Sequence, residues 1–540
     1  MKRFQRIIQT LSLGLFVLLL MLAAYPLSEG LPVDLFLRLD PSIVVGTVIA
    51  ARDAALYFLP GLAVMVLCVL VGRIFCGHIC PMGTTLDFCE QSISKKARAF
   101  QRSIRLRVPT SFRTIKFLFL GLLIGSAMAG VSLIFLGSPL SLVTRFYGLV
   151  LYPLALLIGD QALSFTTFFS RLFPETTYWS LPAKVFATNV FVAFLFLSVA
   201  SSALLQPRFW CRHLCPAGAL LALFSRKPLI RRRVNENCNQ CGKCVRNCPT
   251  GAIDEDPTKT FHSECIVCLK CKEICPQGAI SFAARSFSSE QTLSFSASRR
   301  GVVLSLFAGL VSAGLLKTSV HRPRAPEKER PLVDGDLIRP PGALPEPDFL
   351  TRCVRCGECM KACPTNTLQP TWLKAGLEGI FSPVMLPRLA ACAVNCNVCG
   401  KVCPTGAIRD LSLVEKNHAK VGTAWIAREY CLVWEQDKKC LVCDEVCPYN
   451  AVSFRPVPDR NNAAPFVVAN RCTGCGWCES KCPVEGASAI RVNIVGEVRL
   501  AEGSYVEKAQ EYGFVFRAKD NSIDALAPGT FDDLDPVPKD

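Results

Sequence analysis

Residues 238–249 read CNQCGKCVRNCP, and residues 265–276 repeat the same frame as CIVCLKCKEICP. Each stretch spaces its cysteines as Cys-x2-Cys-x2-Cys-x3-Cys and ends with a proline. Zinc sites rarely take four thiolates at these offsets. Disulfides are not expected in the cytoplasm, and the charges of the neighbouring loops, described below, place this segment there. The frame is typical of thiolates that hold 4Fe–4S cubanes.

The two runs predict an α+β domain of the bacterial two-cluster ferredoxin type over residues 231–290. They form set I (Cys238, Cys241, Cys244, Cys248) and set II (Cys265, Cys268, Cys271, Cys275), and each continues as Pro-x-Gly-Ala-Ile, a turn into a short strand. In such a pair, three thiolates of one run and the fourth thiolate of the other hold each cubane. We therefore expect the first three thiols of set I to join Cys275, and the first three thiols of set II to join Cys248.

Four further sets lie in residues 346–540 and predict a four-cluster domain. The standard spacing is found in set III (Cys353, Cys356, Cys359, Cys363) and set VI (Cys472, Cys475, Cys478, Cys482). The first gap is longer in set IV (Cys392, Cys396, Cys399, Cys403) and set V (Cys431, Cys440, Cys443, Cys447), but all four sets end in Cys-Pro. Because regular sets flank irregular ones, we expect one ferredoxin unit inserted in another, with set III paired to set VI and set IV to set V. Pairing in chain order is the alternative. Trp434 and Trp477 stand beside these sets and are expected to serve in packing.

Of the 30 cysteines in the 540 residues, 24 thus predict six cubanes, and the apolar segments predict a membrane domain over residues 1–230. Residues 7–25, 54–72, 117–136 and 185–206 carry no charge and are long enough, or nearly so, to cross the bilayer as four helices. The shorter apolar segments 41–51 and 146–159 are expected to be re-entrant or interfacial. A fifth helix is expected at residues 301–316, within a segment 291–320 that begins like a twin-arginine export signal, Ser298-Arg299-Arg300. Residues 321–345 are expected to form a linker.

The charges of the loops predict the orientation. Loop 82–116 and segment 207–237 are rich in lysine and arginine, whereas loop 26–53 is not, so the N-terminus and both basic loops are expected in the cytoplasm. The fifth helix would then export the C-terminal domain, although basic residues also follow that helix. This distribution explains much of the net charge of +17 without a nucleic-acid partner. The acidic end, FDDLDPVPKD at residues 531–540, is expected to be disordered.

A second cysteine motif ends two of the expected membrane helices. Residues 73–81 read RIFCGHICP and residues 208–216 read RFWCRHLCP, so the membrane domain is expected to be two tandem copies of a helix pair. A parallel repeat would bring the motif thiols together with His78 and His213 close by, at a site that we call the four-thiol site (Cys76, Cys80, Cys211, Cys215). A seventh iron–sulfur cluster is one interpretation; a redox dithiol pair, a transient metal site or a structural helix end are the others. Cys68 and Cys89 have no partner at ligand spacing.

On these motifs, residues 1–290 resemble NapH, the membrane ferredoxin-type protein that accompanies periplasmic nitrate reductases. Residues 298–540 resemble NapG, an exported ferredoxin-type protein, so the chain looks like a fusion of the two. The resemblance implies a multi-pass protein of the bacterial cytoplasmic membrane that oxidises quinol, or menaquinol, and delivers electrons to a periplasmic reductase or cytochrome. Related families include methylamine-utilisation ferredoxins, regulators of nitrous-oxide reductase and copper-handling oxidase-assembly proteins. These relatives offer two alternative functions, metallocentre assembly or metal reduction and redox sensing.

The sequence assigns no catalytic residue. A quinone site needs an apolar slot and a proton acceptor near a membrane face, and Arg145, Asp160 and Asp40 are candidates because they flank the short apolar segments. No haem-attachment motif Cys-x-x-Cys-His is present, so the chain is expected to hand electrons on to another protein.

Overall fold

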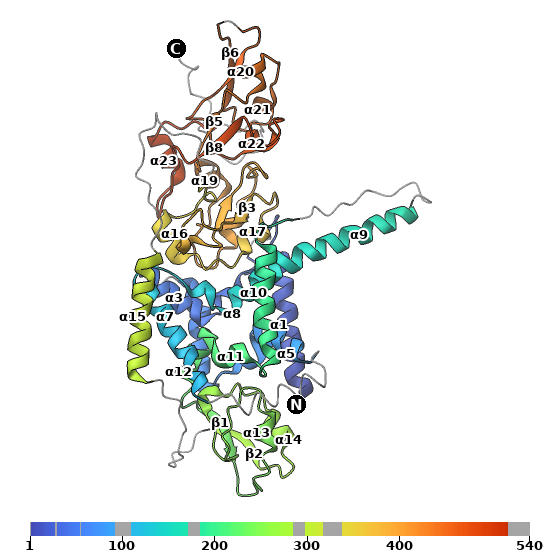
Figure 1. Cartoon of the computed structure of the whole chain (residues 1–540), viewed down its shortest axis with the longest axis vertical. Helices are drawn as coiled ribbons and strands as arrows, with labels where there is room; N and C mark the ends of the chain where they lie inside the picture. The colour runs from blue at the N-terminus through green and yellow to red at the C-terminus, as the bar shows by residue number, and fades with distance from the viewer. Residues whose placement is uncertain are drawn as a thin grey trace.

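The computed structural model describes residues 2–27, 30–53, 56–91, 110–170, 184–284, 298–316, 337–458 and 460–516. Three bodies lie in a row (Figure 1). A helical domain occupies the middle, residues 230–284 form a small domain at one end, and residues 337–516 form a larger domain at the opposite end. Most of the expected linker and the acidic end lie outside the described residues.

The central domain is built from helices and short turns. Its helices are α1 (Lys2–Leu22), α2 (Leu35–Arg38), α3 (Pro41–Ala51), α4 (Leu59–Val71), α5 (Pro81–Gln91), α7 (Ile115–Met128), α8 (Pro139–Phe146), α9 (Tyr152–Ser170), α10 (Asn189–Ser201), α11 (Phe209–His213) and α12 (Pro216–Phe224). Single π-helical turns, η2 (Phe75–Ile79) and η5 (Tyr147–Leu151), connect α4 to α5 and α8 to α9. Many large apolar side chains on α1 and α10 point outward, among them Leu11, Val190 and Phe194, as expected of helices that face lipid.

Among the described residues, three helices are long and apolar enough to cross a membrane: Phe4–Leu22, Pro139–Gln161 and Arg299–Leu316. The other expected spans are shorter helices; α7, for instance, ends at Met128, and Gly130, at φ +77°, follows its last turn. The expectation that residues 146–159 are too short to span is wrong for length, since they lie inside the 23-residue helix Pro139–Gln161. Its outer part, α9, nevertheless runs outward, across the direction of α1 and α10 (Figure 1).

The two halves of the expected repeat fold alike. In each half an apolar helix, α4 or α10, is followed by a short turn that carries the first motif cysteine. The second motif cysteine comes next, and the proline after it begins α5 or α12. Proline is favoured at this position because its missing N–H would have no partner in the first helical turn.

Helix α15 (Arg299–Leu316) packs along α7 and leads from the end that carries the small domain to the end that carries the large one (Figure 1). Glycines allow the close approach: a Cβ on Gly125 would collide with the backbone of Leu306, and a Cβ on Gly309 with that of Leu122. Small residues serve the same purpose in many membrane helix pairs.

Each end domain is held by short antiparallel strand pairs around its cysteines. In the small domain, β1 (Ile230–Val234) pairs with β2 (Ile280–Ala284), next to α13 (Lys243–Asn247) and α14 (Lys270–Ile274). In the large domain the strand pairs are β3 (Leu368–Pro370) with β4 (Pro383–Met385), β5 (Thr423–Ile426) with β8 (Ile490–Asn493), and β6 (Val452–Arg455) with β7 (Ala464–Val467). Its helices are α16 (Glu346–Arg352), α17 (Glu358–Ala362), α18 (Val398–Lys401), α19 (Leu413–His418), α20 (Leu432–Gln436), α21 (Val442–Glu445), α22 (Trp477–Lys481) and α23 (Tyr505–Glu511). Residues 337–345, which the sequence places in the linker, belong to this domain, since Ala343 bridges to Ile408.

Candidate iron–sulfur sites

The small domain shows one half of the crossed arrangement expected from the sequence, while the grouping of Cys275 with the first three thiols of set I stays a prediction. One cavity is lined by the first three thiols of set II together with Cys248 of set I. The backbone N–H of Ala252 donates to Sγ of Cys248 at 3.2 Å, and Nη2 of Arg232 lies 3.7 Å from Sγ of Cys244. Such donors lower the charge density on a thiolate and tune the potential of a bound cluster.

The large domain corrects the expected pairing of its sets. The thiols fall into four groups: group 1 (Cys353, Cys356, Cys359, Cys403), group 2 (Cys363, Cys392, Cys396, Cys399), group 3 (Cys447, Cys472, Cys475, Cys478) and group 4 (Cys431, Cys440, Cys443, Cys482). Set III therefore pairs with set IV, and set V with set VI. The expected nested arrangement is wrong: Cys403 of set IV completes the group of set III, and Cys482 of set VI completes the group of set V. Sets that are neighbours along the chain thus exchange their fourth thiols, as Cys248 of set I joins set II in the small domain.

The four groups follow one another from the central domain to the tip of the large domain. Cys359 of group 1 interacts electrostatically with Cys399 of group 2. The N–H of Cys392 in group 2 donates to the carbonyl of Cys475 in group 3 at 2.8 Å. Cys478 of group 3 in turn interacts with Cys443 of group 4. The order along the domain is therefore 1, 2, 3, 4. The group built mainly from set VI lies closer to the central domain than the group built mainly from set V, although set V comes first in the sequence.

The backbone of the regular sets is bent to aim three thiols at one point. The residues just before and after the second cysteine adopt positive φ in each regular set, for example Val267 at 54° and Leu269 at 59° in set II. A β-branched residue rarely takes this conformation, which costs of order 1 kcal/mol or more. A bound cluster would hold the loop in this conformation and so offset the conformational cost. The residues present thus fit four-thiolate iron–sulfur clusters.

Group 1 is buried against the central domain. Nε of Arg145 donates to the carbonyl of Arg355 at 3.0 Å, and the hydroxyl of Ser141 donates to the carbonyl of Val354 at 2.8 Å. Gly357 has φ +83°, and a Cβ added to it would touch the side chain of Leu149. All three contacts lie within the loop between the first cysteines of set III and α17, so this loop rests on α8 and η5.

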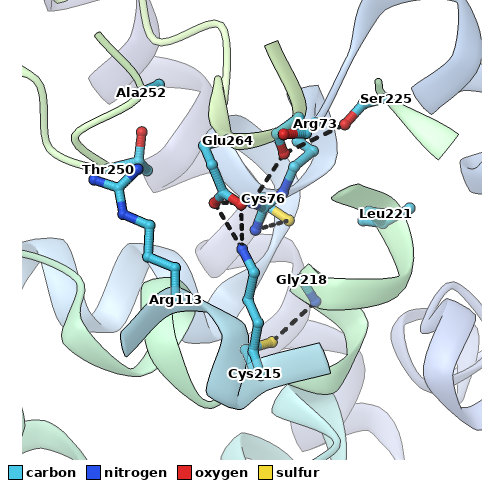
Figure 2. Close-up of polar contacts among 12 residues, drawn as sticks. Arg73, Cys76, Arg113, Cys215, Gly218, Leu221, Ser225, Thr250, Ala252 and Glu264 are labelled. Carbon is cyan, nitrogen blue, oxygen red and sulfur yellow. Dashed lines mark hydrogen bonds and ion pairs between the residues drawn. The ribbon is translucent and has the colours of Figure 1, made fainter. Parts of the chain in front are cut away.

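The small domain is fixed to the other end of the central domain by a buried ion cluster, the Glu264 triad (Arg73, Lys116, Glu264). Nη1 of Arg73 lies 3.1 Å and Nζ of Lys116 2.5 Å from the carboxylate of Glu264. Figure 2 shows Arg73 between Glu264 and Cys76. Burial alone would raise the pKa of Glu264, but the two cations outweigh it and hold that pKa below its usual value.

The thiols of the four-thiol site converge, as the repeat predicts. Cys80 interacts electrostatically with Cys76 and Cys211, and Cys215 interacts with the other three thiols. The histidines of the motif make other contacts: Nδ1 of His78 lies 3.4 Å from the carbonyl of Ile74, and Nε2 of His213 lies 3.2 Å from Oε1 of Gln206.

Two of the three quinone candidates, Asp40 and Arg145, contact neighbouring serines of the α8 region, Ser138 and Ser141, but both have other partners. Asp40 caps α3 and accepts hydrogen bonds from Ser42 and from the hydroxyl of Ser138 at 2.7 Å, so its oxygens already have partners. Arg145 supports group 1, and Asp160 lies on α9. Among the remaining residues, Trp434 donates to the carbonyl of Pro465 and serves in packing, while Trp477 lines the cavity of group 3. Cys68 is buried in the core with its thiol 3.3 Å from the carbonyl of Leu221, and Cys89 lies on α5.

Sequence reasoning missed an aromatic group at the junction of the central and large domains. Phe191 of α10 lies 5.1 Å from Trp372, and Trp372 lies 5.6 Å from Phe381, measured between ring centroids. Phe381 is buried with the guanidinium of Arg145 above its ring, at 5.1 Å. No sequence motif marks these residues, because Phe191 and Arg145 come from segments far from Trp372 and Phe381 along the chain.

Comparison with protein families agrees with these groupings. A model described as a 4Fe-4S binding domain matches residues 54–99 and again residues 188–235, the two halves of the repeat. Models described as 4Fe-4S dicluster domains match residues 230–276, 352–407 and 438–486. The last two ranges follow the chain-order pairing of sets III with IV and V with VI.

Curated relatives are similar over part of the chain. The methylamine utilization ferredoxin-type protein MauM of Paracoccus denitrificans is 38% identical over 165 residues, which cover 30% of this chain and 72% of MauM. The ferredoxin-type protein NapG of Escherichia coli is 34% identical over 28% of this chain and 69% of NapG. The putative electron transport protein YccM of Escherichia coli is 28% identical over 41% of this chain and 54% of YccM. With several 4Fe-4S domains and helices apolar enough for a membrane, the chain belongs to the ferredoxin-type family of MauM and NapG and is a membrane-associated iron–sulfur protein of electron transport.

Proposed function

We propose that this protein is a membrane quinol dehydrogenase that delivers the electrons of quinol to a redox partner at the tip of the large domain. The observation that carries the proposal is the burial of group 1 against α8 and η5. The six cubanes predicted from the 24 cysteines would each supply one-electron transfer when bound. The order of the four cysteine groups, from the central domain to an exposed tip, supports transfer from one cluster to the next.

The aromatic group is the proposed approach of quinol. Val190, Phe194 and Leu197 leave their side chains exposed on α10, and Phe191 and Trp372 are each 41% exposed beside them. Beyond these rings lie Phe381 and Arg145, whose Nε reaches the loop of group 1. An apolar path therefore leads from the lipid-facing side of α10 to the first cysteine group. An aromatic, amphipathic headgroup such as that of a quinol suits a site lined by rings with one cation.

The tip is the proposed place where electrons leave. Tyr430 and Leu441 are exposed and directly adjoin Cys431 and Cys440 of group 4. The acceptor that we propose is a periplasmic reductase or cytochrome, in line with the orientation expected from the basic loops. On this view the small domain lies in the cytoplasm, and the chain joins a NapH-like part to a NapG-like part.

The test is the reduction of the purified, anaerobic protein in detergent by menaquinol, followed through the visible absorbance of the clusters. Trp372→Ala should slow bleaching about tenfold or more if the ring positions quinol, an effect equivalent to about 1.4 kcal/mol. Trp425→Ala is the matched control, because Trp425 is 42% exposed but lies on β5, away from the aromatic group. Reduction by dithionite should be unchanged in both variants.

Failure of wild-type protein to react with menaquinol would reject the proposed function. Equal rates for the two tryptophan variants would reject the aromatic group as the quinol site. Binding of copper by a protein that is silent towards quinol would instead favour metallocentre assembly.

A further inference from the structure

We propose that the four-thiol site holds an iron–sulfur cluster shared by the two halves of the repeat, each half supplying two thiolates. This site is distinct from the six predicted in the end domains. The inference concerns metal binding by the central domain and does not depend on quinol oxidation.

The first argument is the position of the two deeper thiols. Cys80 and Cys215 immediately precede α5 and α12, helices of 11 and 9 residues that begin at proline. The N–H of Gly218 donates to Sγ of Cys215 at 3.2 Å, and Gly83 makes the equivalent backbone contact with Cys80. Each thiol thus takes the place of an N-cap oxygen. Two helix N-termini, each with partial positive charge, stabilise thiolates at one point.

The second argument is an exchange of arginines between the halves. Nη1 of Arg208, from the second half, donates to the carbonyl of Cys76 in the first half at 2.7 Å. Arg73, from the first half, reaches the second: a Cβ on Gly218 would stand 2.7 Å from its Nη2. Gly83 is the counterpart, since its Cβ would stand 2.9 Å from the carbonyl of Cys76 and 3.5 Å from Nη1 of Arg208. The glycine of the frame Cys-Pro-x-Gly is therefore explained at Gly218 by the approach of Arg73, and at Gly83 by the carbonyl of Cys76, which accepts from Arg208.

The third argument is charge. Four thiolates around a cubane core leave a net charge of about −2, which is costly to bury unless cations lie close. Arg73 and Arg208 are each 1% exposed, and both interact electrostatically with thiols of the site. Nη2 of Arg73 lies 4.0 Å from Sγ of Cys76, and within the described residues its Nε has no hydrogen-bond partner. Each arginine also has its own acid, Glu264 or Asp87, which fixes its position.

The fourth argument is the kind and grouping of the possible ligands, which favour a cluster over a single metal ion. One ring nitrogen of each motif histidine faces a partner other than the thiols, the carbonyl of Ile74 or Oε1 of Gln206, and the four thiols are the ligands that the proposal assigns. In the part of the chain that the structure describes, no three Cys, His, Asp or Glu side chains are grouped to hold one metal ion, and this applies equally to the ferredoxin-type sets. A cluster differs from a single ion because it divides the four thiolates among several iron atoms, one for each iron of a cubane or two for each iron of a two-iron cluster.

The contacts of the four-thiol site with the small domain indicate its role in electron transfer. Gly77, inside the first motif, packs so closely on the backbone of Ile266 that no Cβ would fit, and Arg208 interacts electrostatically with Cys268. Both contacts belong to set II. The four-thiol site is therefore placed to exchange one electron with the small domain, one site being oxidised as the other is reduced, which connects that domain to the membrane interior.

The test is the metal content of the full chain, purified anaerobically and measured by iron and sulfide analysis and by native mass spectrometry. Six cubanes contain about 24 iron atoms, a seventh raises the number to about 28, and a two-iron cluster would give about 26. The variant with both Cys76→Ala and Cys211→Ala should lose this excess of two or four iron atoms. The matched control, Cys68→Ala with Cys89→Ala, removes two thiols of the same domain and should keep it.

A wild-type mass that fits six clusters, or six clusters and one zinc or copper ion, would overturn the proposal. This measurement needs no variant, so it decides the matter even if the double variant fails to fold. Identical iron content in the double variant and its control would overturn the proposal as well. Because no quinol is present, the result is independent of the proposed function.

Discussion

Nζ of Lys116 lies 2.5 Å from Oε1 of Glu264, and both side chains are buried. Lys116 stands in the first turn of α7, whereas Glu264 immediately precedes the first cysteine of set II. With Arg73 on the other side of the carboxylate, the contact joins the small domain to the central domain through charges that water does not reach.

Replacing Glu264 by Gln should destabilise the protein by about 3–5 kcal/mol, because two buried cations lose their common counter-ion. The measurement is thermal or denaturant unfolding of the anaerobic protein, with protease sensitivity of residues 230–284 as a second readout. Glu255→Gln is the control, since Glu255 is an exposed carboxylate of the same domain. Equal stability of the two variants would contradict a role of the triad in joining the domains.

Gly218→Ala should destabilise the central domain by about 1–3 kcal/mol, the usual cost of forcing an extra carbon into a filled site. The new Cβ would stand 2.7 Å from Nη2 of Arg73 and displace it. Unfolding and iron content both report the effect. Gly314→Ala provides the comparison, because this helical glycine has no atom within 4 Å of the added Cβ, and there alanine should be neutral or stabilising. A neutral Gly218→Ala would show that Arg73 need not approach the second half.

Lys361→Met should loosen the large domain from the central one. Nζ of Lys361 donates to the carbonyls of Leu20, Met21 and Ala23 at the end of α1, and each buried carbonyl left without a donor costs about 1–3 kcal/mol. Reduction by menaquinol should slow while reduction by dithionite does not. Lys481→Met, on α22 near the last cysteine of set VI, is the exposed control. If both variants react like the wild type, Lys361 does not hold group 1 in place.

Cys403→Ala and Cys482→Ala distinguish the two ways of pairing the sets. Each should remove one cluster, about four iron atoms. With pairing in chain order, Cys403→Ala acts on group 1 and should block menaquinol reduction of the large domain, whereas Cys482→Ala acts on group 4 and should spare it. Nested pairing predicts the reverse, because Cys482 would then complete the group beside the central domain. EPR after menaquinol addition gives the answer.

The sequence by itself predicted the iron–sulfur chemistry of the cysteine sets. The spacing within each cysteine set, the trailing prolines and the Pro-x-Gly-Ala-Ile continuation indicate four-thiolate clusters, because ligand spacing along a short loop is a local property. The recurrence of Arg-x-aromatic-Cys-x-His-x-Cys-Pro likewise predicted the repeat and the approach of its thiols. The apolar segments indicated membrane helices, although not their lengths, since helix ends depend on turns such as that at Gly130.

Only the tertiary structure decided which sets share their thiols and in which order the groups stand. Those relations join residues such as Cys353 and Cys403 that no local spacing constrains. The same holds for the Glu264 triad, the exchange of Arg73 and Arg208 between halves, and the aromatic rings at the junction. Each of these depends on side chains from distant segments meeting in a buried place, where charge, hydrogen bonding and volume must all be satisfied at once.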